Sequence, residues 1–124
     1  MPTVLYLEDT TDQRDLVVMV LQTINIQVEV AADGEEGLKK LEEHRPDLIL
    51  LDLGMPKLDG LGFMKIIKEK PDTSKIPIVV ISAWTASKYR EQAKQAGADD
   101  FVSKPYDIDN LIEVVQKHLI SPAG

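Results

Sequence analysis

Short apolar runs alternate with segments of helical periodicity along the whole chain. Five of these runs predict β-strands, at residues 3–7, 27–31, 47–52, 76–82 and 100–104. The first, third and fourth runs are apolar at nearly every position, which is typical of strands covered by helices on both faces. The chain is therefore expected to form a parallel sheet inside a layered fold.

Segments with a helical pattern follow the strands, and some carry clear start and stop signals. Asp33 and Glu36 form the pattern of a capping box, Leu38 and Leu41 follow on one face, and Pro46 ends the helix. Further helices are predicted at residues 61–70, 86–96 and 108–119. The helix at 86–96 has a thin apolar stripe made mostly of alanine, so we expect it to be weakly anchored.

The alternation of strands and helices predicts the architecture. Right-handed crossovers between parallel strands favour an α/β fold, a doubly wound sandwich of three layers built from five β/α units. A closed eight-stranded barrel would need about twice this length of chain. With 124 residues the chain has the size of one domain, which we place at residues 2–120, followed by a short tail at 121–124.

Composition excludes several classes of protein. No apolar run approaches the roughly 18 residues that a membrane-spanning helix needs. The first residues lack the basic flank and cleavage site of a signal peptide, and the absence of cysteine excludes a disulfide framework, so a cytoplasmic protein is expected. The net charge of -7 would repel a phosphate backbone, which argues against direct binding of nucleic acid.

Polar side chains stand at the ends of four predicted strands. They are Glu8, Asp9, Asp52, Ser82 and Lys104. Because the functional crevice of a doubly wound sheet lies beyond the carboxyl ends of its strands, we expect them to converge on one rim. Three carboxylates held together repel one another unless they share a cation, and oxygen ligands suit Mg²⁺ better than zinc. His44 and His118 fall in predicted helices away from this rim, and we expect both to be solvated.

The same residues carry a resemblance to a known family. Asp52 opens a D-x-x-M-P-x-x-D-G run that ends at Gly60, and the stretch "GADDFVSKP" ends on Lys104 and Pro105. In this order and spacing the set resembles the receiver domain of bacterial two-component response regulators, over nearly the whole chain. The resemblance implies a flavodoxin-like fold with five parallel strands in the order 2-1-3-4-5.

The resemblance also implies how the rim would work. Asp52 would accept a phosphoryl group from a phosphohistidine on a histidine kinase or a histidine phosphotransfer protein. Ser82 and Lys104 would bind the phosphoryl oxygens, and the peptide bond between Lys104 and Pro105 is a candidate for the cis form. The chemistry agrees with these roles, because phosphoryl transfer depends mainly on positioning and on neutralising charge.

A metal site follows from the same resemblance. Asp9, Asp52 and the backbone carbonyl of Gly54 would hold Mg²⁺ or Mn²⁺, and Glu8 would support the ion through water. The glycine and proline residues after Asp52 bend the chain, which would bring the Gly54 carbonyl towards the metal.

To act as a signal, phosphorylation must change a surface elsewhere on the molecule, and the resemblance implies which surface. Ser82 and Phe101 would shift together, and the surface formed by the fourth helix, the fifth strand and the fifth helix would change its partner binding. Gly54 and Trp84 would flank the path of an attacking water without being able to orient it. We therefore predict slow self-dephosphorylation, with Trp84 partly shielding the phosphoryl group.

The first helix contains six successive apolar residues, 16–21. At about 100° per residue they cannot all face the sheet, and placing Val17 and Leu21 inward leaves Val18 and Met19 outside. By the resemblance, this face would dock the kinase or phosphotransfer protein, although a chance scatter of surface apolar residues explains the pattern equally well. The downstream target stays open, and the chain is expected to be a monomer or a phosphorylation-dependent dimer.

Two other functions compete with a phosphoacceptor switch. One is a phosphorylation-independent interaction module with the same fold. The other is a phosphatase of the haloacid dehalogenase type, which wants a second acid two residues after its nucleophile, where this chain has Gly54. The set of rim residues favours the switch, a protein that is not an enzyme and catalyses only its own phosphorylation and slow self-dephosphorylation.

Overall fold

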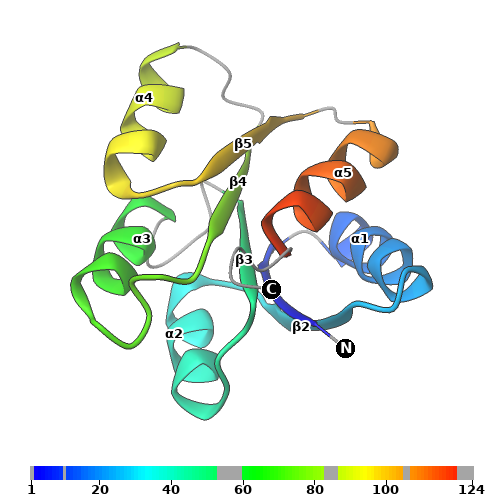
Figure 1. The fold of residues 1–124 in the computed structure, drawn as a ribbon, viewed down its shortest axis with the longest axis horizontal. Coiled ribbons are helices and arrows are strands. Elements are labelled where there is room, and N and C mark those ends of the chain that lie inside the picture. The colour runs from blue at the N-terminus through cyan, green and yellow to red at the C-terminus, as the bar shows by residue number, and fades with distance from the viewer. Residues whose placement is uncertain (1, 10, 53–59, 83–86, 105–106, 120–124) are drawn as a thin grey trace.

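Strands and helices alternate along the chain, and helices lie on both sides of the sheet (Figure 1). The computed structural model describes residues 2–9, 11–52, 60–82, 87–104 and 107–119, so the predicted tail at 121–124 lies outside it. The strands are β1 (Thr3–Leu7), β2 (Gln27–Ala31), β3 (Leu48–Asp52), β4 (Ile78–Ser82) and β5 (Asp100–Ser103). The helices are α1 (Thr11–Thr23), α2 (Gly34–Glu43), α3 (Gly60–Glu69), α4 (Ser87–Ala96) and α5 (Ile108–Leu119).

The sheet has the predicted topology. All neighbouring strands are parallel, and their order is β2-β1-β3-β4-β5. The winding direction reverses between β1 and β3, and in such folds ligands bind beyond the carboxyl ends of the strands at this point. None of the helices in the described ranges has the length and apolar character that crossing a membrane would require.

The strands match the predicted positions, with small differences at their ends. β4 begins at Ile78 rather than at residue 76. The N–H of Ile76 donates to the carbonyl of Thr73 in a turn, and Pro77 has no N–H to donate to a neighbouring strand. The apolar run in the sequence therefore starts before the hydrogen-bonded strand β4 begins.

Two apolar clusters cover the two faces of the sheet. On one face Leu5 and Leu51 pack with residues of α2, α3 and α4, among them Phe63. On the other face Tyr6 and Leu50 pack with residues of α1 and α5. Successive strand residues alternate between the clusters, which explains why the central strands are apolar at almost every position.

Helix α2 begins as its sequence predicts and packs unusually close to the sheet. The side chain of Asp33 accepts a hydrogen bond from the N–H of Glu36 at 2.9 Å, and the Glu36 side chain reaches back to the N–H of Ala32 at 3.3 Å. A Cβ atom added to Gly37 would lie 2.6 Å from Cδ2 of Leu7 in β1. The glycine thus allows α2 to approach β1 closely.

Helix α1 buries the predicted side, but its exposed apolar residues differ from the prediction. Val17 and Leu21 are fully buried as expected, and Met19 is 62% exposed, but Val18 is half-buried and Leu16 is 47% exposed. Around a face centred between Val17 and Leu21, Val18 lies roughly 80° from the centre and Leu16 roughly 120°. The prediction that Val18 points outward is therefore wrong, and the exposed apolar pair on α1 is Leu16 and Met19.

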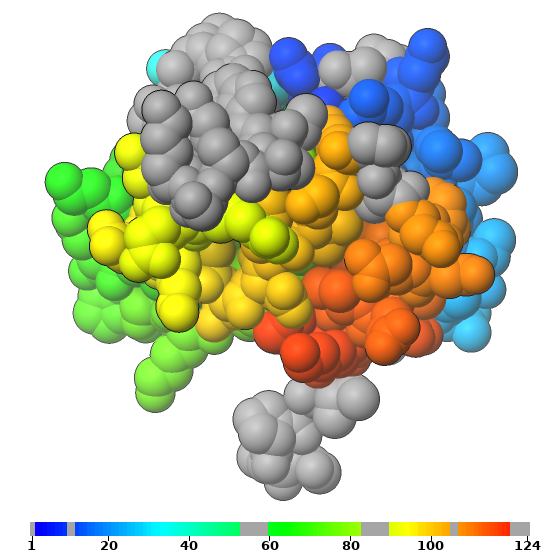
Figure 2. All heavy atoms as spheres, turned by 90° about the horizontal axis from the view of Figure 1, so that it is seen from above, coloured from blue at the N-terminus to red at the C-terminus, as the bar shows by residue number. Residues whose placement is uncertain are grey.

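Helix α4 has little buried surface, in line with its thin apolar stripe. Among residues 90–96 Ala93 is buried and Ala96 is half-buried, while the other side chains are exposed. In Figure 2, α4 in yellow, β5 in gold and α5 in orange to red lie side by side on one face of the molecule.

Candidate functional site

The functional side chains stand where four parallel strands end. Asp52 is the last residue of β3 and Glu8 directly follows β1. Ser82 ends β4, and its carbonyl accepts a 2.8 Å hydrogen bond from the N–H of Lys104, which follows β5. The parallel register thus carries residues from distant parts of the sequence to one edge, at the point where the winding reverses.

Three carboxylates form a cluster at this edge. One oxygen from each of Glu8, Asp9 and Asp52 lies within 4.8 Å of the other two. Glu8 is fully buried, Asp52 keeps 13% of its side chain exposed, and Asp9 is exposed. This set of oxygen donors, open to solvent on the Asp9 side, fits a hard cation such as Mg²⁺, which keeps several waters when bound.

Lys104 places a positive charge against the carboxylates. Its ammonium nitrogen lies 3.2 Å from Oδ2 of Asp52 and 3.3 Å from Oε2 of Glu8. Burial acts to lower the pKa of Lys104, but the charges of Asp52 and Glu8 outweigh burial and raise it. Lys104 is therefore firmly protonated, and it offsets part of the repulsion within the cluster.

The surroundings of Asp52 also raise its pKa, but for an acid this means that the charged form is disfavoured. Burial, the charge of Glu8 and a hydrogen bond with Glu8 raise the pKa of Asp52 from 3.8 to about 7, although Lys104 acts to lower it. A second positive charge at the site would favour the ionised form of Asp52. The carboxylate thus becomes fully charged most readily when a cation joins Lys104.

Two further residues contact this site, and the sequence analysis missed both. The side-chain carbonyl of Gln13 in α1 accepts a hydrogen bond from the ammonium of Lys104 at 2.8 Å. The hydroxyl of Tyr6 in β1 donates to Oε2 of Glu8 at 3.4 Å. Tyr6 lies two residues before Glu8, so the alternation of side chains along β1 could have indicated this contact, whereas no local signal links Gln13 to Lys104.

Ser82 lies on β4, the strand next to that of Asp52, and Phe101 lies on β5, one strand further along the sheet. In the register of β3 with β4, Asp52 pairs with Ile81, so Ser82 is one residue further along the neighbouring strand, and it is 1% exposed. Phe101 is half-buried in β5, with the guanidinium of Arg90 from α4 at 4.9 Å from its ring centroid. A cavity of about 260 Å³ between α4 and β5 is lined in part by Arg90 and Phe101.

Other predicted positions lie outside the described residues or differ from expectation. Gly54, Trp84 and Pro105 are not among the described residues, so their roles stay predictions. The prediction that both histidines are solvated holds for His44, with 66% of its side chain exposed, but is wrong for His118, with 18% exposed.

The half-buried His118 makes a polar contact with β5. Nε2 of His118 lies 3.0 Å from Oδ2 of Asp100, at the first residue of that strand. Burial acts to raise the pKa of Asp100, but the hydrogen bonds with His118 and with the N–H of Phe101, together with the nearby charges of His118 and Lys117, outweigh burial and hold that pKa below its usual value. The last turn of α5 is thus tied to the start of β5.

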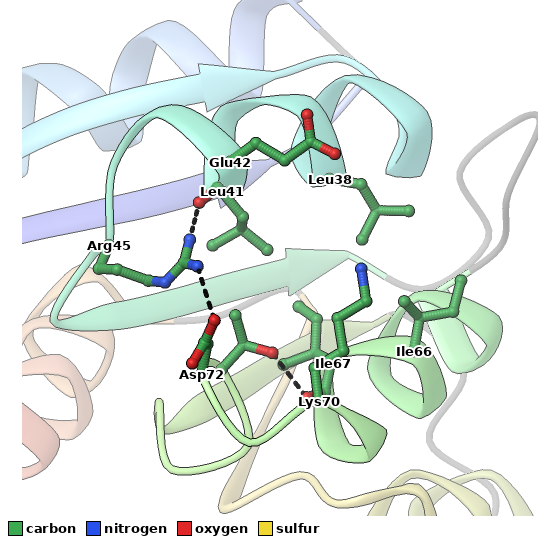
Figure 3. Close-up of a pocket in the computed structure, with 9 residues that line it drawn as sticks. Leu38, Leu41, Glu42, Arg45, Ile66, Ile67, Lys70 and Asp72 are labelled. Carbon is green, nitrogen blue, oxygen red and sulfur yellow. Dashed lines mark hydrogen bonds and ion pairs between the residues drawn. The ribbon is translucent and has the colours of Figure 1, made fainter.

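A separate cavity lies between α2 and α3, away from the carboxylate cluster (Figure 3). It has a volume of about 150 Å³, and Leu41 and Ile67 form part of its apolar wall. Arg45 borders it, donating to the carbonyl of Leu41 and pairing with Asp72 at 3.7 Å. Since helices run opposite to parallel strands, the C-terminal halves of α2 and α3 place this cavity at the other end of the sheet.

Two known proteins are similar to this chain over most of its length. A protein-glutamate methylesterase/protein-glutamine glutaminase of Koribacter versatilis is 40% identical over 124 residues, covering 95% of this chain and 33% of that protein. A probable chemotaxis protein CheY of Rhizobium etli is 30% identical over 114 residues, covering 91% of this chain and 88% of that protein. The chain thus spans a small part of one relative and most of another.

A solved structure and a family model extend the comparison. The receiver domain of the sensor histidine kinase PA1611 from Pseudomonas aeruginosa, with a magnesium ion coordinated in its active site cleft, superposes with a TM-score of 0.89. It is 28% identical, and the match covers 97% of this chain and 98% of that domain. The family model of the response regulator receiver domain matches residues 4–116. This chain therefore belongs to the response regulator receiver domain family.

Proposed function

We propose that this chain is a phosphoacceptor signalling switch in which Asp52 takes a phosphoryl group from a phosphohistidine donor. The observation that carries the proposal is the 3.2 Å contact of Asp52 with Lys104, beside the oxygens of Glu8 and Asp9. A carboxylate held between a fixed positive charge and a cation-binding cluster suits phosphoryl transfer, which depends mainly on positioning and electrostatics.

The transfer step forms one bond and breaks another. A side-chain oxygen of Asp52 forms the P–O bond, while the P–N bond of the phosphohistidine breaks and its electron pair stays on the imidazole nitrogen. The product is an acyl phosphate, whose negatively charged oxygens need partners. We assign these partners to the ammonium of Lys104 and the hydroxyl of Ser82, at the end of the neighbouring strand.

A divalent cation completes the proposed site. Asp9, Asp52 and the carbonyl of Gly54 would hold Mg²⁺ or Mn²⁺, with Glu8 supporting the ion through water. The bound ion supplies positive charge that offsets repulsion between the carboxylates and the phosphoryl oxygens. The all-oxygen cluster and the magnesium-bound receiver domain of PA1611 support this assignment.

The signal would be read on the face formed by α4, β5 and α5 (Figure 2). Ser82 and Phe101 would shift together when the phosphoryl group arrives, and the contact between Phe101 and Arg90 links β5 to α4. The thin anchoring of α4 supports this location, because an element with few buried contacts is easily displaced. Gly54 and Trp84 would leave the acyl phosphate slow to hydrolyse.

A histidine kinase or histidine phosphotransfer protein would supply the phosphoryl group. We propose that it docks on the exposed Leu16 and Met19 of α1, which begins beside the carboxylate cluster. The chain would act in the cytoplasm without turning over a substrate and without binding nucleic acid directly. It would be a monomer or a phosphorylation-dependent dimer.

The test is the intact mass of the chain after incubation with Mg²⁺ and phosphoramidate, a small phosphodonor. The wild type is expected to gain the mass of one phosphoryl group, and Asp52→Asn is expected to gain none. Asp109→Asn, an exposed acid on α5, is the matched control and should behave like the wild type. No adduct on the wild type would reject the switch in favour of a phosphorylation-independent module.

A second donor tests the docking face in the same experiment. With a phosphorylated histidine phosphotransfer protein that labels the wild type, Met19→Glu should be labelled about tenfold more slowly, because a charge enters an apolar contact. With phosphoramidate the same variant should match the wild type, since a small donor needs no docking. Equal rates with both donors would remove the docking role from α1.

A further inference from the structure

Lys104 has a third hydrogen-bond partner at the site, and it is not a carboxylate. The side-chain carbonyl of Gln13 accepts from the ammonium at 2.8 Å, whereas Asp52 and Glu8 lie at 3.2 and 3.3 Å. An ammonium group has three donors and no acceptor. The three partners therefore occupy all the donors of Lys104, and the shortest contact is with the neutral one.

The packing of α1 places Gln13 on the side of the helix that faces Lys104. Gln13 lies near the start of α1, and Val17, one turn later on the same side of the helix, is fully buried in the core. Gln13 is exposed to solvent, but it lies on the same side of α1 as Val17, beyond the core, at the edge where β1 and β3 end. Lys104 thus contacts one residue of α1, one residue of β3 and the residue that directly follows β1.

The chemistry of the three partners differs during the reaction. Asp52 changes from a carboxylate to an acyl phosphate when the phosphoryl group arrives, and the acidic cluster around Glu8 would take up a cation. Gln13 keeps the same carbonyl throughout and adds no negative charge that would compete with the phosphoryl oxygens. It is thus the partner that can hold the ammonium while the others change.

We propose that Gln13 is a positioning residue that holds the ammonium of Lys104 over the reacting oxygen of Asp52 before and during phosphoryl transfer. The inference rests on the proposed function. Lys104 has a long, flexible side chain, and without Gln13 its ammonium samples positions away from the phosphoryl oxygens. Since small misplacements of a charged group are costly in catalysis, we expect transfer to slow by about tenfold.

The test compares two methionine substitutions on the same helix. Gln13→Met keeps the length of the side chain and removes the acceptor, and Gln22→Met makes the same change at an exposed position near the other end of α1. With phosphoramidate and saturating Mg²⁺, Gln13→Met should be phosphorylated about tenfold more slowly, and Gln22→Met at the wild-type rate. The apparent Mg²⁺ affinity, followed by the fluorescence of the single tryptophan, should change less than about twofold in both.

A double-mutant cycle separates positioning of Lys104 from a general effect on α1. In a Lys104→Ala background, Gln13→Met should cause no further loss, because the group that it positions is gone. The affinity for beryllofluoride, a phosphoryl mimic, gives the same cycle a second readout. An equal loss from Gln13→Met with and without Lys104 would overturn the inference.

The remaining outcomes are distinguishable from failure of the proposed function. A wild type that gains no phosphoryl group would overturn the phosphoacceptor function, and this inference with it. A wild type that is phosphorylated normally, together with a Gln13→Met variant that matches it, would overturn the inference alone.

Discussion

At the scale of single residues, Asp52 has an environment unlike that of an ordinary aspartate. Burial and Glu8 raise its pKa from 3.8 to about 7. Between about pH 4 and pH 7 the folded chain therefore binds more protons than the unfolded chain at this group, so its contribution to stability falls as pH rises through that window. Asp52→Asn removes the charge, and without Mg²⁺ it should raise the free energy of unfolding at pH 8 by about 1 kcal/mol, a value reduced for partial solvent screening.

Urea denaturation with EDTA, at several pH values, measures this effect. The gain from Asp52→Asn should be complete above pH 7 and vanish below pH 3.8, where both states bind the proton. Asp109→Asn should show no such pH-dependent gain. Mg²⁺ should stabilise the wild type more than Asp52→Asn, because a ligand that binds the folded chain raises its stability by mass action. A gain independent of pH would contradict the explanation.

At the scale of elements, the close approach of α2 to β1 depends on one position. A Cβ at residue 37 would lie 2.6 Å from Leu7 and 3.0 Å from Phe63, and both of these side chains are fully buried. Gly37→Ala gains roughly 1 kcal/mol of helix propensity but forces α2 away from the sheet at a typical cost of about 1–3 kcal/mol. We expect a net loss of about 1 kcal/mol in urea denaturation.

The control for this prediction lies on the outer side of the same helix. Lys39 is exposed, and Lys39→Ala should change the free energy of unfolding by less than about 0.5 kcal/mol. If Gly37→Ala were as stable as the wild type or more stable, Leu7 and Phe63 would have to be able to move aside, and the close packing of α2 would not depend on the glycine.

The sequence pattern predicts the elements better than it predicts their rotation and long-range contacts. The central strands are recognisable because both faces are buried, and Asp33 and Glu36 mark the start of α2 within four residues. Six apolar residues in a row indicated the buried Val17 and Leu21 but not how wide the buried side of α1 is, so Val18 was placed wrongly. The contact of Lys104 with Gln13 joins residues 91 positions apart, and no local periodicity reports such a pair.

At the scale of the whole molecule, the proposed switch requires that a change at Asp52 reach α4. The route available in the fold runs along paired strands: Ser82 in β4 pairs with Ser103 in β5, and Phe101, two residues earlier on β5, contacts Arg90 of α4. Beryllofluoride with Mg²⁺ should therefore shift the backbone amide resonances of Phe101 and of the α4 residues around Arg90, besides those at the rim.

Variants at the two ends of this route test the prediction. Asp52→Asn should abolish all of the shifts, and Arg90→Ala should move the unliganded amide resonance of Phe101 towards its beryllofluoride position, because the guanidinium no longer holds the ring. Lys94→Ala, one turn later on α4, is the matched control and should leave that resonance in place. A complete shift from 1% to 99% active needs about 5.5 kcal/mol of differential interaction, so intermediate resonance positions are expected in the free chain. Shifts confined to Glu8, Asp52 and Lys104 would mean that the rim does not act on α4, and the signal would have to leave the molecule by another surface.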